Sequence, residues 1–288
     1  MRRSTTIRLT ASAFVAVCAW TTYTQNPPAQ PLNYKQLKDD LWVIEGTSNG
    51  ASDAGNIAVL VTNEGVILID DRFAPDYPEV MAAVKKITPQ PVKYVVNTHH
   101  HGDHTGGNAQ MLTAGVEILI QENARKHMIA TKMPGAPRIA YSHGASVFLG
   151  GKEVRAIYNG RGHTDGDVAV YIPHDHAVHL GDLMAGTRGV TNPVMDYTNG
   201  GSLKAWPATL DAALTLDVDT VIPGHGAVTD KAGLIAHRNK IAAVLKRATT
   251  LVSESKSKDE ISQAMVADFD FKPINLRAVE SMMAELKN

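Results

Sequence analysis

The sequence predicts one mixed α/β domain that follows an N-terminal export signal. Short runs rich in valine and isoleucine, bounded by glycine, asparagine or proline, are typical of buried strands. Longer segments with apolar residues at helical spacing alternate irregularly with them. The 288-residue chain is 44% hydrophobic and shows no internal repeat, so it can bury a sizeable core. We expect a linker and lead-in over residues 26–38 and a single domain with C-terminal helices over residues 39–288.

Residues 1–25 have the layout of a secretory signal peptide. Arginines at the start precede the apolar run Ala11–Trp20, which is too short to span and anchor in a membrane. Cleavage is expected after Ala19 or slightly later. The alternative is a lipoprotein signal that uses Cys18, although Val17 is larger than such signals prefer. We therefore expect a periplasmic or secreted protein.

Composition excludes several classes of function. Without the signal peptide, the chain has 25 basic and 29 acidic residues and therefore a net charge of −4. Removal of the signal peptide also removes the only cysteine, Cys18. This excludes a disulfide framework, a cysteine nucleophile and a cysteine-containing zinc site. The charge balance and the 6% aromatic content argue against nucleic-acid binding. No apolar stretch is long enough to span a membrane. The expected partner is a small-molecule substrate, and the oligomeric state stays open.

The first half of the domain is expected to begin with strands. Three β-type runs, with a hairpin turn at Asn63–Gly65, cover Leu41–Glu45, Ile57–Thr62 and Val66–Asp70. A helix is predicted over Asp76–Thr88, because its apolar residues have helical spacing and Pro89 follows. The valine-rich run Val92–Val96 indicates a buried strand.

The remaining chain alternates both kinds of element and ends in helices. The expected strands are Val116–Ile120, Val154–Tyr158, Val168–Ile172, Ala177–Leu180 and Thr220–Ile222. The expected helices are Glu122–Lys132, Ser202–Leu216, Lys231–Lys246, Glu260–Ala267 and Leu276–Leu286. The polar run Ser253–Lys258 separates the last two helices from the rest.

A dense group of metal-ligand residue types follows the strand at residues 92–96. Residues 99–104 read His-His-His-Gly-Asp-His. Because the chain is expected to turn after the strand, His99, His101, Asp103 and His104 can converge on one point. Neutral imidazoles and carboxylates suit zinc, iron or manganese, and zinc is the commonest occupant of histidine-rich sites.

A ligand-type residue beside glycine recurs in three later segments. They read Gly162-His163-Thr164, Gly181-Asp182-Leu183 and Pro223-Gly224-His225-Gly226. The glycines let backbone and side chains crowd around a small ion. The total is seven candidate ligands, whereas one zinc ion needs three or four, so the sequence predicts two metal ions that share a bridge.

These motifs together resemble the metallo-β-lactamase superfamily. They occur in the family's order, and the likeness covers roughly residues 40–230. The resemblance implies an αβ/βα four-layer sandwich with a metal site at one edge between two sheets. It also implies the ligands: His99, His101 and His163 for the first metal, Asp103, His104 and His225 for the second, and Asp182 bridging both. Asp70 matches the family's early aspartate and would orient a ligand without binding metal.

The branch of the superfamily stays open. The best-known β-lactamases have a cysteine near position 182 or lack a bridging carboxylate there. This chain has Asp182 at that position, and in this it is similar to glyoxalase II and the lactonases. The run Thr98–Asn108 is close to glyoxalase II, whereas Pro223–Gly226 looks more like β-lactamases and lactonases. The tail after Lys231 is shorter than the glutathione-binding domain of glyoxalase II.

Three residues are candidates for contact with substrate. Asn49 lies in the polar loop Glu45–Asp53, and such a loop often flanks the substrate in this superfamily. Tyr197 and Trp206 follow Asp182 and could shape a pocket there.

The expected activity is that of a secreted dinuclear zinc hydrolase. Two cations would lower the pKa of a shared water, and the resulting hydroxide would attack a carbonyl carbon while Asp103 positions it. The expected substrate is a β-lactam or lactone-type ring. The alternatives are a glyoxalase II-like thioester hydrolase, an iron-dependent redox enzyme on the same fold, and a non-catalytic metal-binding protein.

Overall fold

The computed structural model describes residues 32–46, 54–186, 193–272 and 275–287. These residues lie in one compact unit, Pro31–Asn288. The predicted signal peptide lies outside the described residues. None of the described helices is both long and apolar enough to cross a membrane.

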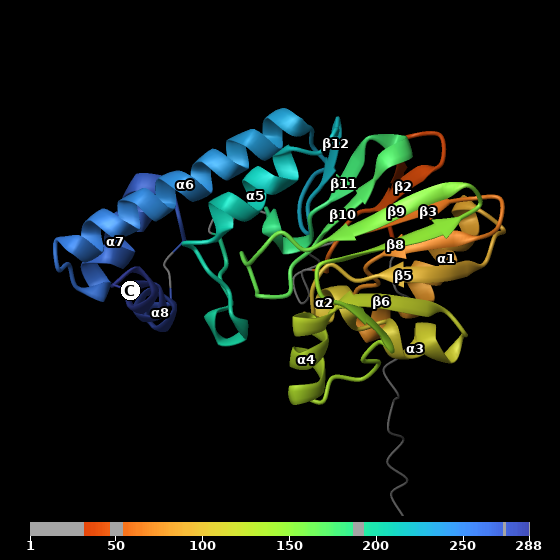
Figure 1. Cartoon of the computed structure of the whole chain (residues 1–288), viewed down its shortest axis with the longest axis horizontal. Coiled ribbons are helices and arrows are strands. Elements are labelled where there is room, and N and C mark those ends of the chain that lie inside the picture. The colour runs from red at the N-terminus through yellow and green to blue at the C-terminus, as the bar shows by residue number, and fades with distance from the viewer. Residues whose placement is uncertain (1–31, 47–53, 187–192, 273–274, 288) are drawn as a thin grey trace, which may run out of the picture. The chain divides into compact units, whose positions relative to one another are not determined.

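The strands form two sheets (Figure 1). The first has the order β1-β2-β3-β4-β5-β6-β7, with strands at Tyr34–Gln36, Leu41–Ile44, Ile57–Val61, Val66–Ile69, Val92–Val96, Glu117–Gln121 and Ile139–Tyr141. The second has the order β12-β11-β10-β9-β8, with β8 to β12 at Gly144–Leu149, Lys152–Ile157, Ala169–Ile172, Ala177–His179 and Thr220–Ile222. Strands β4 to β7 pair in parallel, as do β11 and β12, and the other pairs are antiparallel.

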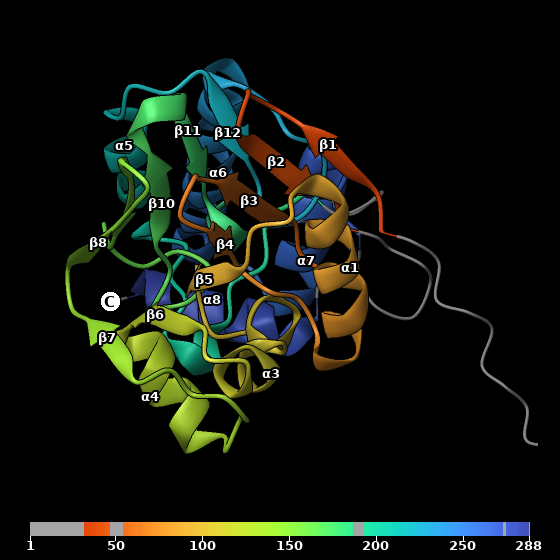
Figure 2. The same ribbon diagram turned by 90° about the vertical axis from the view of Figure 1, so that its right-hand side faces the viewer.

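Helices cover the outer faces of both sheets. Helices α1 to α8 span Tyr77–Ile87, Gly102–Thr105, Asn108–Thr113, Glu122–Ala130, Trp206–Leu214, Lys231–Ser253, Lys258–Phe269 and Leu276–Lys287. Figures 1 and 2 show α1 and α3 beside the first sheet and α5 and α6 beside the second. The layers are therefore helix, sheet, sheet, helix, which confirms the αβ/βα sandwich that the resemblance implied.

The alternation of side chains along the strands explains these layers. In β4, Val66 and Leu68 pack in the cluster with α1, whereas Ile67 and Ile69 pack between the two sheets. Successive side chains of a strand point to opposite faces, so a strand buried on both faces is apolar throughout. This is why the continuous apolar runs of the sequence predicted buried strands.

The structure corrects several predicted boundaries. The helix expected from Ser202 begins at Trp206, with proline in its first turn. The helix expected to end at Lys246 continues to Ser253, because Ala248, Leu251 and Val252 extend its buried face. Strands β1, β7 and β8 and helix α3 were not predicted. All three residues of β1 are exposed, so this strand carries no hydrophobic pattern.

The strand ends bring the histidine motifs together. In the parallel pairs, Ile69 lies beside Val96, and His179 lies beside Ile222, so four carboxyl ends lie at one edge of their sheets. Strand β10 runs antiparallel to β11, and the loop that precedes it is therefore at the same edge. The backbone N–H of Val168 in that loop donates to the carbonyl of Thr98 over 2.9 Å and joins the two sheets there.

Candidate metal centre

The chain turns after β5, as the sequence predicts. Helix α2 begins directly after His101, whose carbonyl accepts hydrogen bonds from the backbone N–H groups of His104 and Thr105. Thr105 Oγ1 donates to the same carbonyl over 3.0 Å. This single helical turn places Asp103 and His104 next to His101 rather than on the opposite faces of a continued strand.

Asp70 holds His104 from behind. Its Oδ2 lies 2.7 Å from His104 Nδ1 and also accepts from the Thr98 hydroxyl over 2.8 Å. Since the hydroxyl donates to Asp70, its oxygen is free to accept from His99 Nδ1, which lies 3.1 Å away. Both Nδ1 atoms therefore carry a proton, and both Nε2 atoms face the centre.

Asp196 and Val194 hold two further imidazoles. Asp196 Oδ2 lies 2.9 Å from His101 Nε2, and the Val194 carbonyl lies 2.6 Å from His163 Nδ1. Both oxygens are acceptors, so the ring nitrogens donate. Sequence reasoning did not identify either partner, because nothing in the sequence links residues 194–196 to a motif about thirty or more positions earlier. The one local signal is that Asp196 caps the turn Tyr197–Asn199.

Three imidazole lone pairs consequently converge on one point. His101 Nδ1 lies 3.2 Å from His99 Nε2 and 2.9 Å from His163 Nε2. In the neutral tautomers assigned above, none of the three atoms carries a hydrogen, so they repel one another unless a cation lies between them. Nitrogens bound to one tetrahedral zinc at about 2.0–2.1 Å lie roughly 3.3 Å apart, which is close to what these rings show.

A second group lies beside the first. Asp103 Oδ2 lies 3.0 Å from His225 Nε2 and 3.4 Å from His104 Nε2, and the two imidazole nitrogens are 3.3 Å apart. Ligand atoms of these three residues, like those of the first three, lie within 4.8 Å of one another.

Asp182 lies between the two groups. Its Oδ1 is 3.4 Å from His104 Nε2 and 3.5 Å from His225 Nε2, whereas its Oδ2 is 3.5 Å from His163 Nε2. One carboxylate oxygen therefore faces each group. Oδ1 is buried and has no hydrogen-bond partner among the described residues. A buried carboxylate oxygen in this situation requires a cation.

The charges of the centre fit divalent metal. Burial, together with the neighbouring imidazoles, lowers the pKa of His99 well below its usual value, so this ring stays neutral. Burial alone would raise the pKa of Asp103, but His104 and His225 outweigh it and hold the pKa below its usual range. Burial opposes protonation of His104, but Asp103, Asp182 and Asp70 raise its pKa well above the usual value, so these carboxylates stabilise a cation here, either the imidazolium or a metal ion. Neutral imidazoles and ionised carboxylates are the forms that coordinate zinc, and they also suit iron and manganese.

Two glycines allow the crowding. A Cβ on Gly224 would overlap Asp182 Oδ1 and the backbone of Gly181, and a Cβ on Gly55 would overlap the ring of His104. Gly224 of the Pro-Gly-His-Gly motif is therefore required by the close approach of the Asp182 carboxylate.

The three predicted substrate residues differ in what the structure shows of them. Trp206 is 1% exposed in the hydrophobic cluster of the second sheet, and its Nε1 donates to the carbonyl of Leu183 over 3.0 Å, so it packs in the core instead of shaping a pocket. The Tyr197 hydroxyl donates to Glu285 of α8 over 3.2 Å. Asn49 lies outside the described residues.

Comparisons with known proteins agree with this fold and centre. The family model described as the metallo-beta-lactamase superfamily matches residues 51–225. A metallo-beta-lactamase type 2 from Bacillus sp. (strain 170) is 27% identical over 217 residues, which cover 72% of this chain and 80% of the relative. A 2,4-dinitroanisole O-demethylase subunit alpha from Nocardioides sp. (strain JS1661) is 27% identical over 166 residues, 56% of this chain and 49% of that protein. A solved metallo-beta-lactamase from Pontibacter korlensis has a similar fold, with a TM-score of 0.64 at 24% identity, covering 73% of this chain and 98% of that one.

Proposed function

Because this chain belongs to the metallo-β-lactamase superfamily and is a metal-dependent hydrolase, we propose that it binds two zinc ions and opens a cyclic amide or ester of the β-lactam or lactone type. We propose further that residues 1–25 are a signal peptide and that residues 39–288 act as the hydrolase domain in the periplasm or outside the cell. The arginines and the short apolar run of residues 1–25 support the first of these points.

The convergence of three unprotonated imidazole nitrogens is the observation that carries this function. His99, His101 and His163 would hold the first zinc ion, and Asp103, His104 and His225 the second. Asp182 would bridge both, since each of its oxygens faces one group.

The exposed side of the centre indicates where substrate arrives. The side chains of His101 and Asp103 are 29% and 20% exposed, whereas those of His163 and His225 are 4% and 6% exposed. A carbonyl group therefore approaches from the side of His101 and Asp103.

Bound zinc would supply an acidified water and polarise the carbonyl of the substrate. The Asp103 carboxylate, ionised and partly exposed, would orient the nucleophile and accept its proton before passing it to the leaving group. His104 and His225 contact Asp103 and limit the positions that its carboxylate can take.

The test combines metal analysis with hydrolysis. We expect about two zinc ions per chain and hydrolysis of nitrocefin or of a simple lactone, and we expect His101→Ala to lower metal content and activity together. Full activity of this variant with two metals still bound would overturn the ligand assignment. Hydrolysis of a glutathione thioester alone would move the enzyme to the thioester branch, and one iron per chain would indicate the redox alternative.

A further inference from the structure

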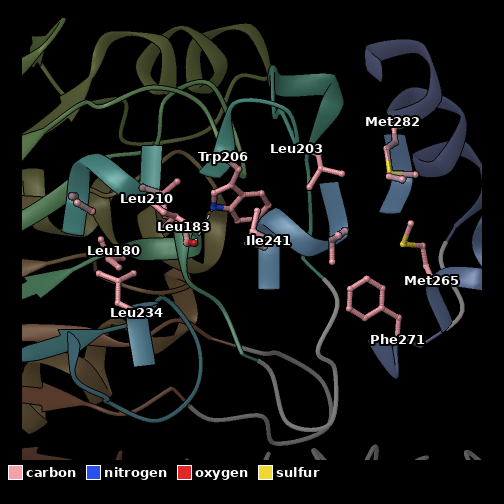
Figure 3. Close-up of a cluster of buried hydrophobic side chains, with 14 of the residues drawn as sticks. Leu180, Leu183, Leu203, Trp206, Leu210, Leu234, Ile241, Met265, Phe271 and Met282 are labelled. Carbon is pink, nitrogen blue, oxygen red and sulfur yellow. Dashed lines mark hydrogen bonds between the residues drawn. The ribbon is translucent and has the colours of Figure 1, made fainter. Parts of the chain in front are cut away.

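An apolar cavity of about 220 Å³ lies between residues 193–195 and the C-terminal helices. We call it the methionine pocket, after three of its lining residues, Met195, Met265 and Met282. Val194, Phe271 and Val279 also line it. Among its described lining residues, only Asn275 has a polar side chain, and none is charged. Figure 3 shows Met265, Phe271 and Met282 grouped at one end of the hydrophobic cluster of the second sheet.

The methionine pocket borders the metal centre through one short segment. The carbonyl of Val194 accepts from His163 Nδ1, and Asp196 accepts from His101 Nε2. Val194 and Met195 also line the pocket. The same segment thus contacts ligands of the first metal group and forms a wall of the cavity.

The mouth of the pocket is open to solvent. Val194 is 57% exposed, and Asn275 on the other side is also exposed. Two residues after Val194, the Asp196 side chain is 20% exposed and contacts His101, so the exposed edge of the centre and the wall of the pocket belong to one short segment.

The size and chemistry of the pocket select a hydrocarbon group. A cavity of about 150 Å³ lined by apolar residues binds benzene, so this one has room for a phenyl ring or a chain of about six carbons. Methionine side chains are flexible and polarisable, and they adapt to ligands of different shape. A charged group would find no partner among the described lining residues.

We propose, on the basis of the hydrolase function above, that the methionine pocket binds an uncharged hydrocarbon side group of the substrate while His101 and Asp103 face its carbonyl. The preferred substrates are then esters or lactones that carry an alkyl or aryl group. A bare ring is a poorer substrate because it leaves the pocket empty.

Helix α8 holds the pocket in a fixed position relative to the centre. Glu285 accepts hydrogen bonds from the Tyr197 hydroxyl, the Ser202 hydroxyl and the backbone N–H of Leu203. These bonds tie α8, which contributes Val279 and Met282 to the wall, to the segment that follows Asp196. Binding in the pocket therefore needs little ordering of the wall.

A binding experiment tests the pocket independently of catalysis. The zinc-loaded full chain, labelled with 13C at its methionine methyl groups, is titrated with 1-hexanol. We expect saturable shifts of the Met195, Met265 and Met282 methyl signals. Ala278→Phe, which fills the pocket from the half-buried lining position on α8, should weaken binding at least tenfold. Ala284→Phe, an equal enlargement at an exposed position of the same helix outside the pocket lining, should not.

Unchanged hexanol binding in a folded Ala278→Phe variant, or the absence of saturable shifts in the wild type, would overturn the inference. Thermal unfolding of both variants shows whether they fold. If Ala278→Phe does not fold, Ala278→Leu replaces it, with an expected weakening of at least threefold.

Hydrolysis of two lactones tests the link between pocket and centre. γ-Decalactone carries a hexyl chain, and γ-butyrolactone carries none. We expect kcat/KM to favour γ-decalactone at least thirtyfold, since each fully buried methylene contributes about fourfold. Ala278→Phe should bring the ratio close to one, and Ala284→Phe should leave it unchanged. If both lactones are hydrolysed with a similar kcat/KM, the inference about the pocket is overturned and the proposed function is not. Absence of hydrolysis of both lactones and of nitrocefin overturns the proposed function, and the methyl shifts then decide on the pocket.

Discussion

Each of four ligand imidazoles has a hydrogen-bond acceptor behind it. Thr98 faces the ring of His99, and Asp196 faces the ring of His101. Val194 faces the ring of His163, and Asp70 faces the ring of His104. Such partners fix the tautomer and direction of a ring before metal binds, and their loss typically lowers metal affinity. Asp196 is the most informative of them, because no sequence motif pairs it with His101 and its carboxylate can be altered without replacing a candidate ligand.

Asp196→Asn should lower zinc affinity about 10- to 100-fold. The asparagine keeps an acceptor oxygen but loses the negative charge that strengthens the bond to His101. Zinc affinity is measured by competition with a coloured chelator, and activity is followed in parallel. Asp217→Asn, a change of the same kind at a carboxylate whose side chain is 86% exposed, is the matched control. Equal affinities of the two variants would show that Asp196 does not position His101.

Gly224→Ala should reduce the metal content. The added Cβ overlaps Asp182 Oδ1, so the carboxylate that faces both groups must move. We expect elemental analysis to find fewer than two metal ions per chain, with the thermal midpoint of the metal-loaded protein lowered. Gly102→Ala is the control, because the nearest heavy atom to a Cβ there is 4.0 Å away, at Met133. Full metal content in Gly224→Ala would mean that the site adapts to the added methyl group.

The contact between α8 and residues 197–203 joins the C-terminal helices to the centre. Three donors of this segment converge on the single carboxylate of Glu285. The segment begins directly after Asp196, so its position affects the ring of His101. The C-terminal helix therefore supports the metal centre although it supplies no ligand.

Glu285→Ala should lower the free energy of unfolding by about 1–3 kcal/mol, because three donors lose their acceptor. Urea unfolding of the metal-loaded protein measures the change. Glu280→Ala on the same helix is exposed and should change the free energy by less than about 0.5 kcal/mol. If the two variants unfold at the same urea concentration, the Glu285 bonds do not anchor the helix.

Strands whose residues are nearly all buried were predicted well, and strands with few buried residues were not. The expected strands Ile57–Thr62 and Val66–Asp70 each end only one residue beyond β3 and β4. Strand β8 pairs only with β9 and exposes Phe148 at 71%, so its pattern resembles a loop. A hydrophobic pattern in the sequence shows which residues are buried. A poorly buried edge strand has no such pattern, because it is a strand only through its hydrogen bonds to the neighbouring strand.

His237 gives the whole molecule a dependence on pH that is separate from the metal ligands. Its Nε2 lies 3.0 Å from the carbonyl of Leu183 and donates to it, which links α6 to the turn that carries Asp182. Burial lowers the pKa of His237 to about 4. The fold therefore holds this ring neutral, whereas an unfolded chain protonates it near pH 6.5.

The stability of the protein should fall as the pH decreases from about 6.5 to about 4. In this range the unfolded chain binds a proton at His237 and the folded chain does not, which favours unfolding by up to about 3 kcal/mol. His237→Gln should remove this part of the pH dependence. Asp167, whose pKa burial raises to about 6, has the opposite sign and is the same in both proteins.

Urea unfolding of the metal-free wild type and His237→Gln at pH 7 and pH 5 measures the effect. The loss of stability between the two pH values should be larger in the wild type. An equal loss in both proteins would show that His237 is protonated in the fold at pH 5.

The sequence by itself determined a mixed α/β domain and the seven candidate ligands, because these depend on local patterns: apolar runs, glycines and the spacing of histidines and aspartates. The order of the motifs carried the resemblance to the family, and the αβ/βα layers were expected from that resemblance. The tertiary structure alone decided which atoms face each other. Asp196 and Val194 contact the ligand rings, and Glu285 contacts residues 197–203, only because the chain from residue 193 to 203 lies against both. Trp206 likewise packs in the core. Contacts between residues far apart in the chain depend on how the layers pack, and no local pattern encodes that packing.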